Sequence, residues 1–136
     1  MASNLPFTQK QLIILILFGI TLWFLAAMLL RVLGPMGIYE GSARFILYAL
    51  IIPGSWPFVW IAKWIAELRN DQIFSAVAVA TMAAALCDGL ALAWFPALYA
   101  ATPELVAGAG GTILWGAGVI MALGFWMNKP AVETSS

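Results

Sequence analysis

Long runs of apolar residues dominate the chain, and short polar segments separate them. We expect these runs to form four membrane spans at approximately residues 11–33, 44–65, 72–98 and 105–127. A helix needs about 20 mostly apolar residues to cross the hydrocarbon core of a bilayer, and only the second run, whose apolar stretch covers residues 45–62, is near the lower limit. The pattern therefore predicts an all-α fold, in which residues 1–136 form a single domain: a polytopic membrane protein with a four-helix transmembrane bundle.

The polar residues that precede three of the runs have the character of helix N-caps. Thr8 is followed three positions later by Gln11, which fits a capping box. Ser42 and Thr102 stand just before the second and fourth runs, and a serine or threonine there can accept a hydrogen bond from a backbone N–H of the first turn. We expect all three residues to begin helices, and Asn70 or Asp71 can cap the third run in the same way.

The composition supports a membrane location. Of the 136 residues, 64% are hydrophobic and 9% are charged, whereas a soluble domain has about half apolar and a quarter charged residues. A soluble protein of this size could not bury so much apolar surface, so the lipid bilayer is the expected partner. Six basic and six acidic residues cancel, and without a broad positive field we expect no nucleic-acid partner.

The scarcity of catalytic and metal-binding side chains excludes several functions. The chain has no histidine and a single cysteine, Cys87. Catalytic triads that depend on histidine are therefore excluded, and the usual ligands of zinc, haem and iron–sulfur clusters are missing. The sequence predicts no metal, no cofactor and no catalytic residues, so we do not expect an enzyme.

The positions of lysine and arginine predict the orientation. Cytoplasmic ends of membrane helices carry an excess of these residues. With both termini in the cytoplasm, four basic residues lie inside and two lie outside. The inside residues are Lys10, Lys63, Arg69 and Lys129, and the outside residues are Arg31 and Arg44.

Asp88 is the one charged residue in the middle of a run, and it is the main site candidate. An aspartate at the centre of a span costs about 2.5–3.5 kcal/mol on insertion scales, so it should face the bundle interior and have a partner. Ala80 and Ala84 precede it at four-residue spacing, which indicates a packed helix face. Arg31 is the preferred partner, with Arg44 as the other candidate. The pair is either a working carboxylate held by an arginine or a structural ion pair.

The second run contains residues that could form a kink or a pocket. Pro53 and Pro57 each remove a backbone hydrogen bond, and Ser55 lies between them. Broken helices at this depth can expose carbonyl groups to a ligand, although prolines are also common in ordinary membrane helices. Trp23 and Trp115 lie deep in their runs and are further pocket candidates.

The fourth run carries a stripe of small residues. Gly108, Thr112 and Gly116 recur at four-residue spacing. Small residues let two helices approach closely in a membrane. We expect this stripe to pack either inside the bundle or across a homodimer, and the pattern does not distinguish the two.

Several short segments resemble a bacterial family of small four-span membrane proteins that is classified only as a domain of unknown function. The first run closes on Arg31 and Gly34 as Arg-x-x-Gly, Asp88 precedes an apolar and aromatic stretch, and Trp115 completes a Leu-Trp pair. A proline-glycine pair of that family is replaced by alanines at residues 83–85. The resemblance implies four spans and a bacterial inner-membrane location, and it adds weight to Arg31 and Asp88 without implying an activity.

Three hypotheses of function follow from these features. The first is a small integral membrane protein of unassigned activity with an intramembrane Asp88 site paired to Arg31. The second is a proton-coupled transporter of small molecules that acts as a dimer. The third is a non-catalytic accessory subunit of a larger membrane complex, which the short connections and apolar helices would suit.

Overall fold

The computed structural model of the chain describes residues 7–130. Within these residues the secondary structure is helical, and no strand is present. Four α-helices are long and apolar enough to cross a membrane. They are α1 (Gln9–Leu33), α2 (Gly41–Ile65), α3 (Ile73–Trp94) and α4 (Pro103–Met127), joined by the short 3-10 helices η2 (Gly34–Met36), η3 (Asn70–Gln72) and η4 (Pro96–Leu98). The predicted all-α, four-helix fold is confirmed, and it supports an integral membrane location.

The third helix is shorter than the predicted span of residues 72–98. Three of the predicted spans fall inside the observed helices, but α3 ends at Trp94. Phe95 adopts φ −134° and ψ 53°, because the ring of the following Pro96 disfavours a helical conformation at the residue before it. The chain then forms η4 and turns back toward the bundle.

Two of the four predicted N-caps are confirmed. The Thr8 side chain accepts a hydrogen bond from the backbone N–H of Gln11, whose side chain accepts one from the backbone N–H of Thr8. The Thr102 side chain accepts from the backbone N–H of Leu105. Both helices therefore begin with one of their otherwise free N–H groups satisfied.

The predicted cap at Ser42 is wrong, because α2 begins one residue earlier and its N-cap is Glu40, without a side-chain hydrogen bond. The predicted cap of α3 at Asn70 or Asp71 is wrong as well, because both residues lie in η3 and the N-cap is Gln72. The first turn of α3 receives a hydrogen-bond partner from a distant part of the chain. The side-chain oxygen of Asn128, at the end of α4, accepts a hydrogen bond from the backbone N–H of Phe74 at 3.0 Å. Such a cap depends on tertiary contact, and no local pattern announces it.

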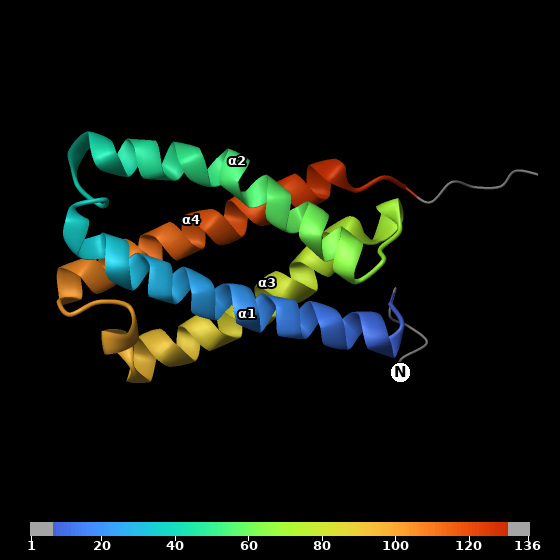
Figure 1. Cartoon of the computed structure of the whole chain (residues 1–136), viewed down its shortest axis with the longest axis horizontal. Helices are drawn as coiled ribbons and strands as arrows, with labels where there is room; N and C mark the ends of the chain where they lie inside the picture. Colours follow the sequence, from blue (N-terminus) through green and yellow to red (C-terminus); the bar gives the residue numbers. More distant parts are fainter. Residues whose placement is uncertain (1–6, 131–136) are drawn as a thin grey trace, which may run out of the picture.

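The order of the helices in space differs from their order in the chain. Helix α1 packs mainly against α3, α3 against α4, and α4 against α2, whereas the sequence neighbours α1 and α2 contact each other much less. Figure 1 shows that α1 starts, α2 ends, α3 starts and α4 ends at the same end of the bundle, called here the terminal end. The opposite end, called the distal end, holds the α1–α2 and α3–α4 connections.

Helices α1 and α3 come very close together. A Cβ atom added to Gly19 would overlap the backbone carbonyl of Ala80, so only glycine fits at this crossing. Ala76 and Ala80 are buried, which confirms the predicted packed face of α3, and Ala84 further along is half-buried. Small residues on both helices permit this contact.

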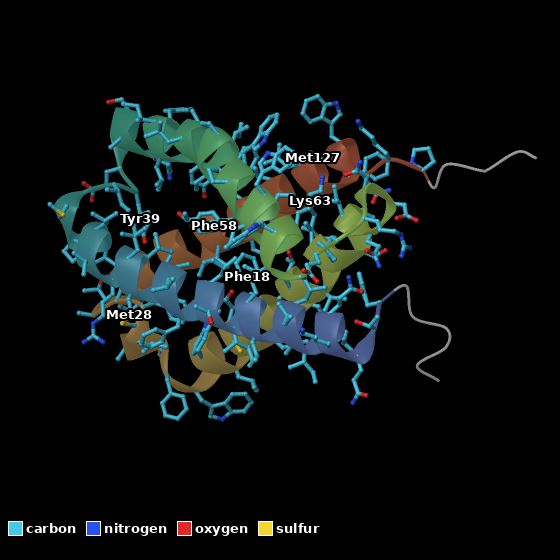
Figure 2. The ribbon with its side chains drawn as sticks, turned by 45° about the vertical axis from the view of Figure 1, so that its right-hand side comes forward. Phe18, Met28, Tyr39, Phe58, Lys63 and Met127 are labelled. Carbon is cyan, nitrogen blue, oxygen red and sulfur yellow. The ribbon has the colours of Figure 1, made fainter. Side chains whose placement is uncertain are left out.

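The stripe of small residues on α4 packs inside the bundle. Gly108 lies against the ring of Tyr39, where a side chain would collide, and Thr112 is buried with its hydroxyl donating to the Gly108 carbonyl at 2.8 Å. A Cβ atom on Gly116 would meet Ile51 of α2 at 3.9 Å. Figure 2 shows Tyr39 at the distal end, where its side chain lies among the helices. Of the two predicted roles, the structure shows packing within one chain.

Helix α2 is unbroken at its prolines. It continues from Gly41 to Ile65 with Pro53 and Pro57 inside it, and Figure 1 shows it changing direction near its middle. Prolines cannot donate a backbone hydrogen bond, which explains a bend. The prolines therefore lie in a helix that bends and is not broken.

Candidate functional site

Asp88 lies in a short chain of hydrogen bonds that joins α3, α1 and the segment that follows η4. The Tyr99 hydroxyl donates to Asp88 Oδ1 at 2.5 Å, and the Nε1–H of Trp23 donates to the Tyr99 hydroxyl oxygen at 2.8 Å. Tyr99 is fully buried, while Asp88 and Trp23 are half-buried. The carboxylate is thus held by a phenol that is itself positioned by an indole, and we call these three residues the Asp88 network.

The turn after α3 places Tyr99 in this network. Asp88 lies about 9 Å before the end of α3, since six residues at 1.5 Å each separate it from Trp94. The chain must therefore turn back for Tyr99 to reach it. Pro96 begins η4, and the backbone N–H of Tyr99 donates to the Pro96 carbonyl at 3.0 Å. This turn returns the phenol to the interface of α3 and α1.

The predicted pairing of Asp88 with Arg31 is wrong. Arg31 is exposed in the last turn of α1, and it makes no ion pair or hydrogen bond with any residue from 7 to 130. The ion pair of the described chain is the one between Arg69 and Asp71 at the terminal end. An arginine extends into solvent or headgroups at lower cost than into a packed interior, because its charge stays hydrated there. A neutral hydroxyl takes its place beside Asp88.

The surroundings of Tyr99 keep its hydroxyl protonated. Burial raises the pKa of Tyr99 above its ordinary value, and the hydrogen bond to Asp88 raises it further. The phenol therefore remains a hydrogen-bond donor at physiological pH. Asp88 Oδ2 has no hydrogen-bond partner among the described residues, so one of the two carboxylate oxygens stays available to a proton or a ligand.

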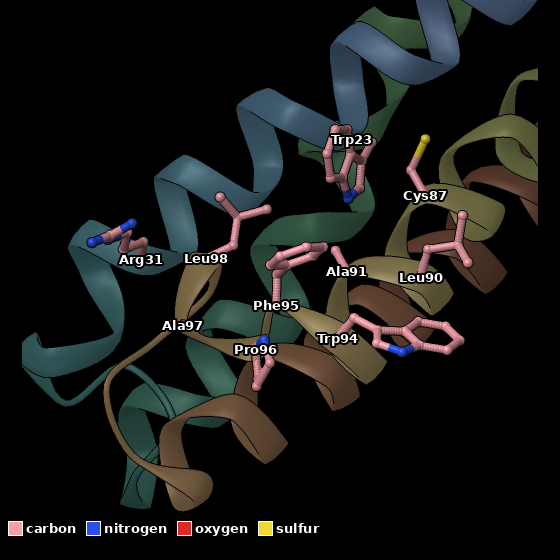
Figure 3. A pocket seen from close by; sticks show the side chains of 10 residues that line it. All are labelled: Trp23, Arg31, Cys87, Leu90, Ala91, Trp94, Phe95, Pro96, Ala97 and Leu98. Atoms are coloured by element: carbon pink, nitrogen blue, oxygen red, sulfur yellow. The ribbon is translucent and has the colours of Figure 1, made fainter.

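The network borders an open groove on the side of the bundle. Trp23 lines this groove while its Nε1–H reaches Tyr99. On α3, Cys87 and Ala91 stand on either side of Asp88 in sequence, and both face the same groove. Figure 3 shows Trp23 and Cys87 on facing helices at one end of it. Trp23 therefore belongs to both the groove and the Asp88 network, whereas Asp88 itself does not line the groove.

The other predicted site residues lie elsewhere. The side chain of Arg44 is exposed at the start of α2 and contacts no polar partner in the described chain. The indole of Trp115 stacks on Tyr48 with ring centres 5.4 Å apart, and its Nε1–H donates to the Tyr48 carbonyl at 2.9 Å. Trp115 thus joins α4 to α2 and does not line the groove beside Trp23.

The kink candidates also lie away from the network. Pro53 and Pro57 are exposed on α2, and Ser55 is half-buried without a side-chain hydrogen bond to a described residue. None of the three lines the groove beside Trp23. Among the predicted pocket residues, Trp23 alone contributes to it.

Tyr99 is a member of the candidate site that the sequence pattern does not single out. It stands outside the helices, eleven positions after Asp88. A local signal was nevertheless present, because Pro96 soon after the aspartate indicates a turn that can bring the following residues back. No three Cys, Asp or Glu side chains within residues 7–130 are arranged to hold a metal ion.

No protein-family model, curated protein or solved structure matches this chain. The resemblance to a bacterial four-span family therefore stays a prediction.

Proposed function

We propose that this chain is a proton-coupled carrier of small molecules in the bacterial inner membrane, and that Asp88 is its proton-binding group. The observation that carries the proposal is the partner of Asp88. The carboxylate is held by the neutral hydroxyl of Tyr99 at 2.5 Å, and no cationic side chain of residues 7–130 pairs with it. Ionisable residues inside membrane spans commonly mark proton or substrate pathways.

A carboxylate without a counter-ion suits exchange between a proton and a cation. When Asp88 is ionised, the site carries a net negative charge in apolar surroundings, and either a proton or a positively charged molecule neutralises it. The Tyr99 hydroxyl holds Oδ1 in place, while Oδ2 is free of described partners. Binding of a lipophilic cation should therefore displace a proton from Asp88.

The proposed orientation has both termini in the cytoplasm. Lys10, Lys63, Arg69 and Lys129 belong to the terminal end and outnumber the two arginines of the distal end, which favours a cytoplasmic location for the terminal end. Asp88 lies in the distal half of α3. It would then face the outer half of the bilayer.

Proton release on cation binding tests the proposal. We expect the purified full chain to release a proton into weakly buffered detergent solution when it binds tetraphenylphosphonium, and Asp88→Asn to release none. Glu104→Gln is the matched control, because Glu104 is an exposed carboxylate near the same end. Equal release from the wild type and Asp88→Asn would contradict the proposal, as would a wild type that does not bind the cation.

The dimeric carrier and the accessory subunit predicted from the sequence are separated by one further measurement. Extraction in a mild detergent, followed by mass determination, should give a homodimer if the carrier works as a pair of chains. Stoichiometric recovery with other membrane proteins would instead favour the accessory subunit. The predicted absence of enzymatic activity stays a prediction.

A further inference from the structure

An open groove is hollowed into the side of the bundle beside the end of α3. It has a volume of about 670 Å³ and lies between α1 on one side and α3 with η4 on the other (Figure 3). Its walls are almost entirely apolar and aromatic, and Arg31 supplies the one charged side chain. The lining residues are Trp23, Arg31, Cys87, Leu90, Ala91, Trp94, Phe95, Pro96, Ala97 and Leu98.

The groove runs along the bundle from its interior toward the distal end. Trp23 and Arg31 both line it, and eight residues of α1 separate them, which corresponds to about 12 Å along the helix axis. Arg31 stands in the last turn of α1, at the distal end. Trp94 and Phe95 flank the groove and are 70% and 71% exposed. The groove is therefore elongated and open on the outer side of the bundle.

Arg31 has no anion among the described residues. Glu40 and Glu104 belong to the same end of the bundle, yet neither forms an ion pair with it. The guanidinium carries several N–H donors in a planar fork that matches phosphate geometry. Arg31 is thus a cation without a described partner at the end of an apolar groove. Such a site is complementary to a molecule with a negatively charged headgroup and an apolar tail.

We infer that this groove holds one acyl chain of an anionic phospholipid, with the lipid phosphate at Arg31. An acyl chain gains little from leaving other lipid tails for an apolar groove, because both surroundings are equally apolar. Selection among lipids therefore comes from the charge of the headgroup at Arg31 and from the shape of the groove. The inference does not depend on proton binding by Asp88.

Native mass spectrometry of the purified full chain tests this site. Phosphatidylglycerol and phosphatidylcholine with identical acyl chains are added separately, and the dissociation constant of the first bound lipid is measured. We expect preference for phosphatidylglycerol in the wild type and a loss of about fivefold in that preference for Arg31→Gln, as expected for one basic residue near an anionic lipid. Arg44→Gln is the matched control, since Arg44 is an exposed arginine of the same end that does not line the groove.

A second variant tests the groove itself. Leu90 lines the groove and is 62% exposed, so Leu90→Trp should fill part of the space without disturbing the core, and should weaken phosphatidylglycerol binding. Equal preference in Arg31→Gln and the wild type would overturn the inference. So would binding of glycerol 3-phosphate as tight as that of the lipid, which would indicate a phosphate site without a chain. A stable dimer whose formation prevents lipid binding would show that a second copy covers the groove.

Discussion

The bundle contains two helix pairs that pack in different ways, α1 with α3 and α2 with α4. In the first pair the backbones themselves approach, with Gly19 against the carbonyl of Ala80. In the second pair aromatic rings lie between the helices, with Tyr48 stacked on Trp115. Backbone contact leaves little room for adjustment, whereas rings can shift slightly. The Asp88 network bridges the close-packed pair, where its donors and acceptors are held most rigidly.

The polar contacts of the two pairs differ as well. Between α1 and α3 the indole of Trp23, the phenol of Tyr99 and the carboxylate of Asp88 form a connected chain of side chains. Between α2 and α4 the indole of Trp115 bonds a backbone carbonyl, that of Tyr48. A connected network loses more when one member is removed, because the remaining polar groups are left without partners. The comparison predicts larger mutational effects in the α1–α3 pair.

The largest effect is expected at the closest contact. Gly19→Ala should lower the free energy of unfolding by about 3 kcal/mol, since the new methyl group meets backbone and cannot be accommodated by a rotamer change. Unfolding in mixed micelles, followed by circular dichroism, measures this. Gly118→Ala is the control, because a Cβ atom there has nothing within 4 Å. Similar losses for both substitutions would refute the proposed helix contact.

The next largest effect is expected in the Asp88 network. Tyr99→Phe removes the donor to Asp88 and should cost about 2 kcal/mol of stability, as for a hydrogen bond to a charged group. In the Asp88→Asn background the same change should cost only about 0.6 kcal/mol, the average for neutral hydrogen bonds in a membrane protein. A double-mutant cycle gives the difference. Equal costs in both backgrounds would show that Tyr99 acts through packing alone.

A smaller effect is expected where glycine meets a ring. Gly108→Ala should lower the free energy of unfolding by about 1 kcal/mol, because the added methyl group would collide with the Tyr39 side chain, which can move more easily than backbone. Comparison with Gly19→Ala in the same assay sharpens the contrast between a glycine packed against backbone and a glycine packed against a ring. A loss at Gly108 that exceeds the loss at Gly19 would reverse the comparison.

The two indole hydrogen bonds should differ in their contribution to stability. Trp115→Phe keeps a ring beside Tyr48 and removes one hydrogen bond, so we expect a cost of about 0.6 kcal/mol. Trp23→Phe should cost more, because it also releases the hydroxyl that holds Asp88. Thermal unfolding of the two variants side by side measures the difference, and an identical result would argue against a coupled network.

The smallest effect is expected at Arg31. Arg31→Gln should change the free energy of unfolding by no more than about 0.5 kcal/mol, since the guanidinium contacts no polar group of the described chain. Its effect should add to that of Asp88→Asn without coupling. A coupling energy well above the error of the double-mutant cycle would indicate an ion pair between Arg31 and Asp88, which the described residues do not form.

Part of the site could be predicted from the sequence, and part could not. Asp88 stood out because a charge within an apolar run must be accommodated by the fold. Its partner was expected among the arginines, because opposite charge is the obvious compensation. Tyr99 compensates through a hydrogen bond instead, and its approach depends on the turn at Pro96. The separation of eleven positions between Asp88 and Tyr99 in the sequence does not show that the two side chains meet in space.

The sequence by itself determined the four helices and the residues that had to be small or apolar, because the bilayer permits only backbone that satisfies its own hydrogen bonds over a fixed thickness. Tertiary structure alone decided which helices pair, that Asn128 caps α3, and that Tyr99 rather than Arg31 reaches Asp88. The physical reason is the range over which each effect acts. Hydropathy acts residue by residue along the chain, whereas a hydrogen bond requires two atoms within about 3 Å in space, and only the packing of α1 against α3 brings these atoms together.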